Sequence, residues 1–162
     1  MLLLAGGVGI APIMGLLREM VARRDRRPVR LAYAAGQPAN FACLSEIDAA
    51  KTVLDLRVML LSEEGAEDWP GLIGRLDRGR LAELLEGLAA KETVALICGP
   101  GPMVSSVSDT LLDLGMPMNN VVYERFDYGG GMSSRQDRRR SLQFAATGLT
   151  LALVLALFVV MR

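Results

Sequence analysis

The sequence contains no histidine and only two cysteines, Cys43 and Cys98, among its 162 residues. The absence of histidine excludes bis-histidine haem ligation, a histidine-based catalytic triad and the commonest zinc sites. Two cysteines are too few for the four ligands of an iron–sulfur cluster, and they indicate no disulfide framework. We therefore expect a reduced, cytoplasmic setting, no metal site, and chemistry that depends on a bound cofactor or on few side chains.

Neither sign of charge predominates, because 18 basic residues balance 18 acidic ones. This balance argues against a nucleic-acid-binding surface over the whole chain, so we expect no nucleic-acid partner. We also expect no signal peptide, since Met1 begins an apolar segment without a basic segment before it. The length allows one domain with a substantial core, plus an appendage.

The first twelve residues, MLLLAGGVGIAP, predict a buried strand, a tight glycine loop and the start of a helix. Residues 2–5 are apolar enough for a strand buried on both faces, and Gly6, Gly7 and Gly9 permit positive φ and close backbone approach. Pro12 suits a first helical turn, whose free N–H groups could bind a dinucleotide pyrophosphate. The alternative is a turn that only connects strand and helix, since Pro12 replaces the third glycine of the dinucleotide fingerprint.

Strand and helix patterns alternate along the first 126 residues. They predict an α/β fold with a five-stranded parallel sheet and helices on both faces. Residues 67–78, which include Trp69 and Gly74, are expected to form an irregular excursion, and Cys43 is expected to be a core residue of the second helix. The expected strands are residues 2–5, 29–34, 54–61, 93–98 and 121–126, and the later helices are residues 41–50, 80–90 and 103–114.

The composition changes after residues 1–128, the expected globular domain. Residues 129–141 combine glycine and serine with four arginines and predict a flexible basic linker. Residues 142–161 carry no charge, and these 20 residues would span roughly 30 Å as a helix, the thickness of a bilayer core. They predict a transmembrane helix rather than a buried core helix. The arginines before it predict a single-pass cell-membrane protein with the globular domain in the cytoplasm.

Two further motifs stand at the ends of predicted strands, CGPGPM at residues 98–103 and ERF at residues 124–126. With the glycine loop, they resemble the NAD(P)-binding domain of the ferredoxin–NADP reductase superfamily over about residues 2–128. In that superfamily a flavin-binding barrel precedes this domain, and hydride passes from nicotinamide to flavin and onward as single electrons. The resemblance therefore implies the nucleotide-binding half of a flavin-dependent oxidoreductase.

The resemblance also implies which residues form the site. Cys98 and Glu124 are the implied catalytic residues; a buried thiol without a role and a solvated or arginine-paired carboxylate are the alternatives for them. Ser62, after the third strand, joins the cofactor-binding set, and Phe126 lies at the junction of nicotinamide and flavin. Gly7, Val8, Gly9 and Pro12 are implied along the pyrophosphate, and Gly99 and Pro100 border the nicotinamide with Cys98. The remaining implied cofactor-binding residues are Gly6, Ile10, Ala11 and Met103.

The residue after Ser62 bears on the choice between NADH and NADPH. Relatives that use NADPH often carry Ser-Arg at this place, where this chain has Ser62-Glu63. A carboxylate would repel a 2′-phosphate with nearly two negative charges, so the sequence favours NADH. Because Met1 adjoins the first strand, we expect FAD to be held by a flavin-binding barrel located upstream in a longer protein or in a separate chain.

Two other functions remain open at this point, and the electron acceptor protein has no signature in the sequence. One is a non-catalytic, membrane-tethered module that senses NADH or adenine nucleotides without a flavin. The other is a membrane-tethered adaptor in which the glycine loops are relics. An upstream reading frame encoding a flavin-binding barrel would favour the reductase over both.

Overall fold

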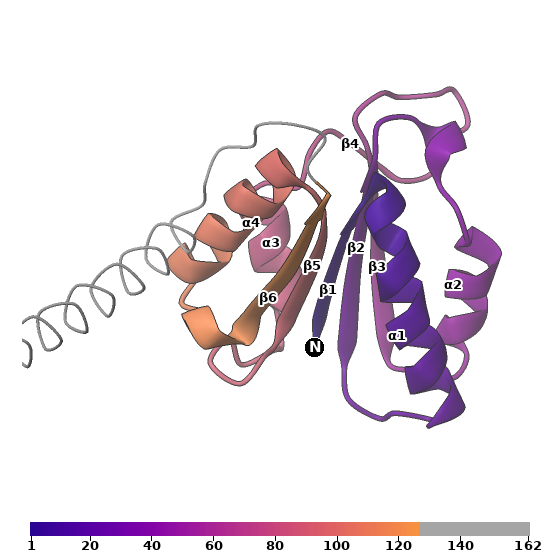
Figure 1. Cartoon of the computed structure of the whole chain (residues 1–162). Helices are drawn as coiled ribbons and strands as arrows, with labels where there is room; N and C mark the ends of the chain where they lie inside the picture. The colour runs from indigo at the N-terminus through magenta and orange to yellow at the C-terminus, as the bar shows by residue number, and fades with distance from the viewer. Residues whose placement is uncertain (127–162) are drawn as a thin grey trace, which may run out of the picture.

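Strand β1 (Leu2–Gly6) lies near the centre of a parallel sheet, and all five of its residues are buried. The computed structural model describes residues 1–126, which form this sheet and two helical layers (Figure 1). The strand order is β4-β3-β2-β1-β5-β6, and every neighbouring pair is parallel. The other strands are β2 (Val29–Ala35), β3 (Leu56–Ser62), β4 (Leu72–Ile73), β5 (Ala95–Pro100) and β6 (Val121–Phe126).

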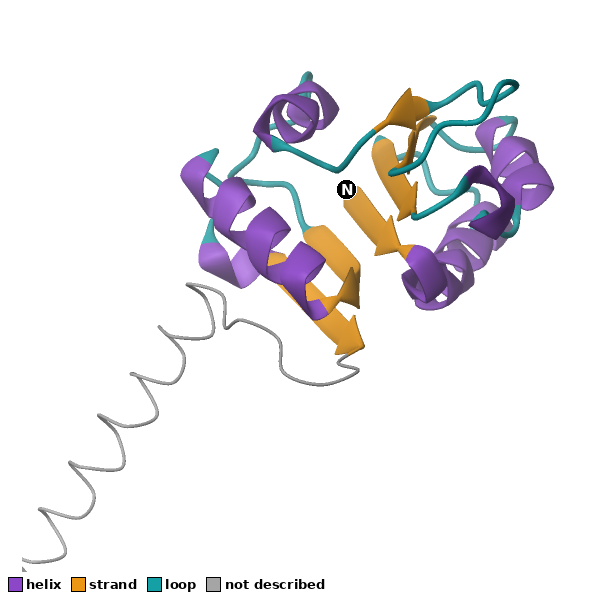
Figure 2. Ribbon diagram, turned by 90° about the horizontal axis from the view of Figure 1, so that it is seen from above, coloured by secondary structure: helices purple, strands orange, loops and turns teal. Residues whose placement is uncertain are grey.

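Helices cover both faces of the sheet, as the alternating pattern predicted. Figure 2 shows from above that the helices form a layer on each side of the strands. One face carries α1 (Ile10–Ala22) and α2 (Leu44–Lys51), and the other carries α3 (Arg78–Leu85) and α4 (Gly101–Asp113). Three short 3₁₀ helices connect them, at Gly7–Gly9, Pro38–Asn40 and Met118–Asn120.

Two hydrophobic cores result from the alternation of side chains along β1. Leu3 belongs to the core beneath α1 and α2, whereas Leu2 and Leu4 belong to the core beneath α3 and α4. In α1, Leu17 and Met20 are buried in the first core, as the helical spacing predicted. Burying a side chain of this size stabilises the fold by about 1.5–3 kcal/mol relative to leaving it exposed. The two cores therefore hold the helical layers on the sheet.

The sheet has six strands rather than the predicted five. The additional strand, β4, contains only two residues, and it pairs with the end of β3 through Leu61–Leu72 and Ser62–Ile73. It lies inside the segment at residues 67–78 that was expected to be irregular. The sequence did not predict this strand, because two residues are too few to show an alternating pattern.

The prediction that Cys43 is a core residue of the second helix is wrong. Cys43 is exposed, has φ +60° and precedes α2, which begins at Leu44. The apolar side chain before it, Phe41, packs outside the helix instead, edge-on to Tyr33 at 4.8 Å and stacked on Trp69 at 4.7 Å between ring centroids. This aromatic contact takes residues 41–43 out of the helical pattern.

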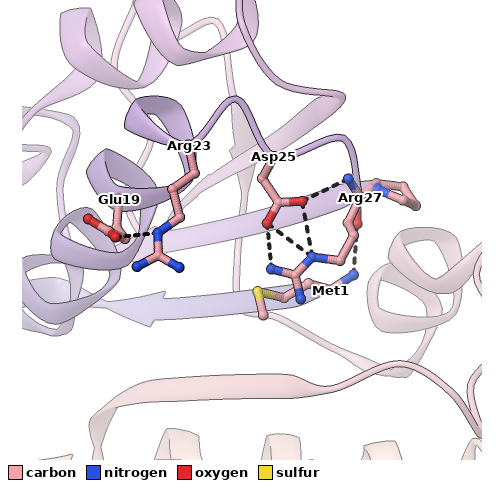
Figure 3. A network of polar contacts seen from close by, with 6 residues as sticks. Met1, Glu19, Arg23, Asp25 and Arg27 are labelled. Atoms are coloured by element: carbon pink, nitrogen blue, oxygen red, sulfur yellow. Dashed lines mark hydrogen bonds and ion pairs between the residues drawn. The ribbon is translucent and has the colours of Figure 1, made fainter.

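A polar network fixes the opposite, amino edge of the sheet (Figure 3). The Met1 amino group donates to the Pro28 carbonyl at 2.7 Å, and the Asp25 carboxylate accepts the Arg27 backbone N–H at 2.9 Å and the Arg27 guanidinium. Hydrogen bonds from Arg27 lower the pKa of Asp25 to about 2. These contacts hold the turn between α1 and β2.

The predicted basic linker at residues 129–141 and the predicted transmembrane helix at residues 142–161 lie outside the described residues, as do the last two residues of the expected domain, 127 and 128. Within residues 1–126, none of the helices has the length and apolar character needed to cross a bilayer.

Candidate functional site

A cavity of about 430 Å³ lies at the carboxyl ends of β1, β2 and β3, on the side of α3 and α4. Strand order reverses here, because β2 and β5 flank β1, and open parallel sheets bind ligands at such a point. The volume falls within the range of ligand pockets. Its wall is formed by Gly6, Gly7, Ala34, Ala35, Gly36, Glu63, Gly74, Arg75, Leu76, Pro100, Pro102, Met103, Ser106 and Val107.

The glycine loop after β1 forms one end of this cavity. Gly7 has φ +54°, a conformation that favours glycine, and it lies in the cavity wall with Gly6. Gly6 has a different role, since a Cβ there would be 2.4 Å from the Met103 Sδ atom and 3.0 Å from Pro100 Cδ. The positive φ predicted for the loop therefore occurs at Gly7, and Gly6 permits contact with the end of β5 and the first turn of α4.

Two helices begin beside the cavity without a side-chain cap. No side-chain cap occupies the starts of α1 and α4, whereas Asp77 caps α3 by accepting the Arg80 N–H at 2.9 Å. Pro102 and Met103, in the first turn of α4, line the cavity. The Ile10 N–H at the start of α1 already donates to the Gly7 and Val8 carbonyls of the preceding 3₁₀ helix. A helix start without a side-chain cap still carries a partial positive charge, which suits a phosphate.

The predicted cofactor-binding residues at positions 8–12 lie around the start of α1 rather than in the cavity wall. Val8, Ala11 and Pro12 are exposed, and Val8 is 63% exposed. Gly9 and Ile10 are buried. The exposed residues form the rim of the first helical turn, and the buried ones fix its position on the sheet.

Cys98 and Glu124 are partners on neighbouring strands β5 and β6, with the Cys98 Sγ atom 4.0 Å from Glu124 Oε2. Glu124 is exposed, but Cys98 is only 3% exposed. Burial raises the pKa of the Cys98 thiol, and the Glu124 carboxylate raises it further. Both effects favour the protonated thiol over the thiolate, which is the form that acts as a nucleophile.

These residues lie on the other face of the sheet from the cavity. Cys98 belongs to the core beneath α1, and the half-buried Phe126 packs against that core. Met103, by contrast, packs with the core beneath α4. A dinucleotide that reached both regions would cross the carboxyl edge of the sheet near Gly6 and Gly99, where the glycine loop contacts the end of β5.

The structure places Ser62 inside the fold and Glu63 at the surface of the cavity. The buried Ser62 hydroxyl donates to the Gly36 carbonyl at 3.5 Å and so links the ends of β3 and β2. Glu63 lies in the cavity wall, where Arg75 Nε and Nη2 donate to its two carboxylate oxygens at 2.9 and 3.0 Å. This hydrogen bonding raises the pKa of Arg75.

Sequence reasoning missed part of the cavity wall. Gly74, Arg75 and Leu76 come from the turn between β4 and α3, and Ser106 and Val107 come from the second turn of α4. The glycine at position 74 was the sequence signal for the turn that carries Arg75 and Leu76. In the structure Gly74 has φ +106°, a conformation that favours glycine. Within residues 1–126, no three His, Cys, Asp or Glu side chains group as metal ligands would.

Residues 3–109 match the family described as the oxidoreductase NAD-binding domain. The chain belongs to this family. The match extends from β1 into α4 and so includes the glycine loop, the cavity and Cys98.

Relatives of this NAD-binding domain include reductase components. The chain is 33% identical over 127 residues to the reductase component of propane 2-monooxygenase from Mycolicibacterium smegmatis, covering 76% of this chain and 36% of that protein. It is 32% identical over 131 residues to the xylene/toluene monooxygenase electron transfer component XylA of Pseudomonas putida, covering 78% of this chain and 36% of that protein. The chain thus spans about a third of these relatives.

A solved structure shows the same fold. The flavohem-like FAD/NAD-binding domain of nitric oxide dioxygenase from Vibrio cholerae superposes with a TM-score of 0.68 at 23% identity, over 77% of this chain and 50% of that one. This likeness confirms the parallel α/β fold.

Proposed function

We propose that this chain is the NADH-binding half of a membrane-anchored, FAD-dependent oxidoreductase. The observation that carries the proposal is the position of the cavity, beside two uncapped helix starts and at the same sheet edge as Cys98 and Glu124. FAD would be held by a flavin-binding barrel outside residues 1–126, and electrons would pass to an acceptor protein that is not identified.

Each part of the site has a task in this proposal. The turn at Gly7 and the starts of α1 and α4 would bind the pyrophosphate, and the cavity end at Gly36 and Glu63 would hold the adenosine ribose. When bound, the dinucleotide supplies a hydride and the flavin of the partner domain accepts it. Cys98 would border the nicotinamide as a small, neutral thiol.

Glu124 and Phe126 would complete the nicotinamide end of the site. The Glu124 carboxylate lies beside the Cys98 thiol at 4.0 Å and is exposed, so a flavin domain could reach it. The half-buried Phe126 ring would restrict water at the same edge. Because Cys98 is only 3% exposed, close contact with a nicotinamide ring requires this edge to open.

The exposed Glu63 carboxylate supports NADH as the preferred dinucleotide. It lines the cavity and would repel a 2′-phosphate, while it can accept a hydrogen bond from a free ribose hydroxyl. Titration calorimetry with the full chain in mild detergent tests this directly. We expect one site that binds NADH more tightly than NADPH; absence of binding, or a preference for NADPH, would contradict the proposal.

The membrane anchor in this proposal is supported by the sequence of the tail. Residues 142–161 carry no charge, and four arginines stand at 135–140. This pattern favours a single-pass anchor in the cell membrane, with the NAD-binding domain in the cytoplasm.

A further inference from the structure

The ion pair between Glu63 and Arg75 joins two segments at the end of the cavity. Glu63 follows β3 and Arg75 follows β4, and both line the wall. Two parallel contacts connect them, from Arg75 Nε to Oε1 at 2.9 Å and from Arg75 Nη2 to Oε2 at 3.0 Å. The third guanidinium nitrogen, Nη1, takes no part in this pair. A negative and a positive group thus meet where the ribose would lie.

The backbone beneath Arg75 is held by several hydrogen bonds. Arg80 Nη2 donates to the Ile73 carbonyl at 2.7 Å, and Arg80 Nη1 donates to the Arg75 carbonyl. The Gly74 N–H donates to the Ser62 carbonyl at 2.7 Å, which continues the pairing of β3 and β4. The turn is therefore fixed relative to β3, and the place of the ion pair follows from the fold.

The side chains themselves are free to exchange partners. The Arg75 side chain is 82% exposed and that of Glu63 is 49% exposed. An ion pair with this exposure contributes little to stability, since water competes for both groups. Phosphate offers arginine the same two-pronged geometry as a carboxylate, with a larger charge. A phosphate that entered this end of the cavity could therefore replace Glu63 as the partner of Arg75.

We propose that the Glu63–Arg75 ion pair sets how strongly the site prefers a free ribose over a ribose with a 2′-phosphate. We call this pair the selector, because Arg75 can exchange the Glu63 carboxylate for the phosphate. With a free ribose, Glu63 keeps Arg75 and accepts a hydroxyl hydrogen bond. With a 2′-phosphate, Arg75 leaves Glu63 for the phosphate, which offsets the repulsion from the carboxylate. The selector rests on the proposed function, since it requires the ribose at this end of the cavity. Arg75 thus limits the preference for NADH that Glu63 creates.

The two members of the pair can be tested separately with adenine nucleotides that need no flavin. We would titrate the full chain in mild detergent with 5′-AMP and with 2′,5′-ADP, and compare the ratio of the two dissociation constants among variants. Arg75→Leu should weaken binding of 2′,5′-ADP roughly tenfold and leave 5′-AMP nearly unchanged, the effect of losing one hydrogen bond to a charged group. Glu63→Gln should strengthen binding of 2′,5′-ADP.

The chain offers a matched control in a second two-pronged pair. Arg18 Nε and Nη2 donate to the Glu46 carboxylate at 2.6 and 2.8 Å, with side chains 57% and 42% exposed, between α1 and α2 and away from the cavity wall. Arg18→Leu and Glu46→Gln make the same changes in charge and should leave the ratio unchanged.

The possible outcomes distinguish a failure of the selector from a failure of the proposed function on which it rests. Opposite shifts of the ratio in the Arg75 and Glu63 variants, without a shift in the controls, would support the selector. An unchanged ratio in a chain that binds 5′-AMP would overturn the selector and leave the proposed function standing. Failure of the unaltered chain to bind any of the nucleotides, NADH included, would overturn the proposed function and the selector with it.

Discussion

Gly9 lies so close to β5 that a Cβ on it would be 2.0 Å from the carbonyl oxygen of Cys98. The contact is reciprocal at the next residues, since a Cβ on Gly99 would be 3.2 Å from the Gly6 Cα atom. The loop after β1 and the end of β5 therefore pack backbone against backbone. A change in the loop must move the end of β5, which carries Cys98.

Replacing Gly9 with alanine should consequently destabilise the domain. The nearest atoms belong to backbone and have little room to move, so we expect a loss of about 1–3 kcal/mol in the free energy of unfolding. Gly15→Ala is the matched control, because Gly15 is an exposed position of α1 with no atom within 4 Å of its Cβ. That change should stabilise the helix by up to about 1 kcal/mol. Urea unfolding followed by circular dichroism measures both; equal stability of the two variants would show that the loops do not pack in this way.

The two cysteines should differ strongly in reactivity. Cys43 is exposed, whereas Cys98 is 3% exposed and has a raised pKa. Since the thiolate is the reactive form, a maleimide at pH 7 should modify Cys43 first and Cys98 far more slowly. Mass spectrometry of timed samples, with Cys43→Ser as the control that isolates the second site, gives the two rates. Comparable rates would contradict the burial of Cys98.

The turn at the amino edge predicts a dependence of stability on acidity. The pKa of Asp25 is lowered to about 2 by Arg27, so its contribution to stability is fully present above the ordinary carboxyl pKa near 4. That contribution is lost as the pH falls from about 4 toward 2. The stability of the unaltered chain should fall more steeply over this interval than that of Asp25→Asn. Identical slopes in urea unfolding at a series of pH values would exclude this role for the pair.

The membrane topology can be tested with the cysteine that the structure leaves exposed. If the domain is cytoplasmic, an impermeant maleimide should fail to label Cys43 in intact cells and should label it after permeabilisation. An Arg162→Cys variant should show the opposite pattern, because residue 162 would lie across the membrane. Labelling of Cys43 from outside intact cells would refute the proposed orientation.

Much of the fold followed from local patterns in the sequence. The apolar run before Gly6 and the positive φ at Gly7 were predictable, because a buried strand and a tight turn have strong local signatures. The position of Cys43 was not, since it depends on the contact between Phe41 and Trp69, which are 28 residues apart.

The candidate site was likewise predictable only in part. The resemblance implied that Cys98 and Glu124 serve the same end of the site, and the structure pairs them on the neighbouring strands β5 and β6. The position of Arg75 could not be predicted from the sequence, because it depends on the two-residue strand β4 and on the hydrogen bonds from Arg80. The repulsive role assigned to Glu63 from the sequence was incomplete for this reason, since it considered the carboxylate without its partner.

Reconstitution with a flavin domain tests the central claim most directly. Positioning a hydride donor within about 3–3.5 Å of its acceptor lowers the barrier by several kcal/mol, and the flavin-binding barrel would provide that acceptor. The 162 residues expressed as given should bind NADH, purify without colour and oxidise NADH no faster than buffer. Fused to or mixed with a matching flavin-binding barrel, they should oxidise NADH with an artificial electron acceptor. A yellow preparation of these residues alone, with stoichiometric flavin and rapid turnover, would contradict the account.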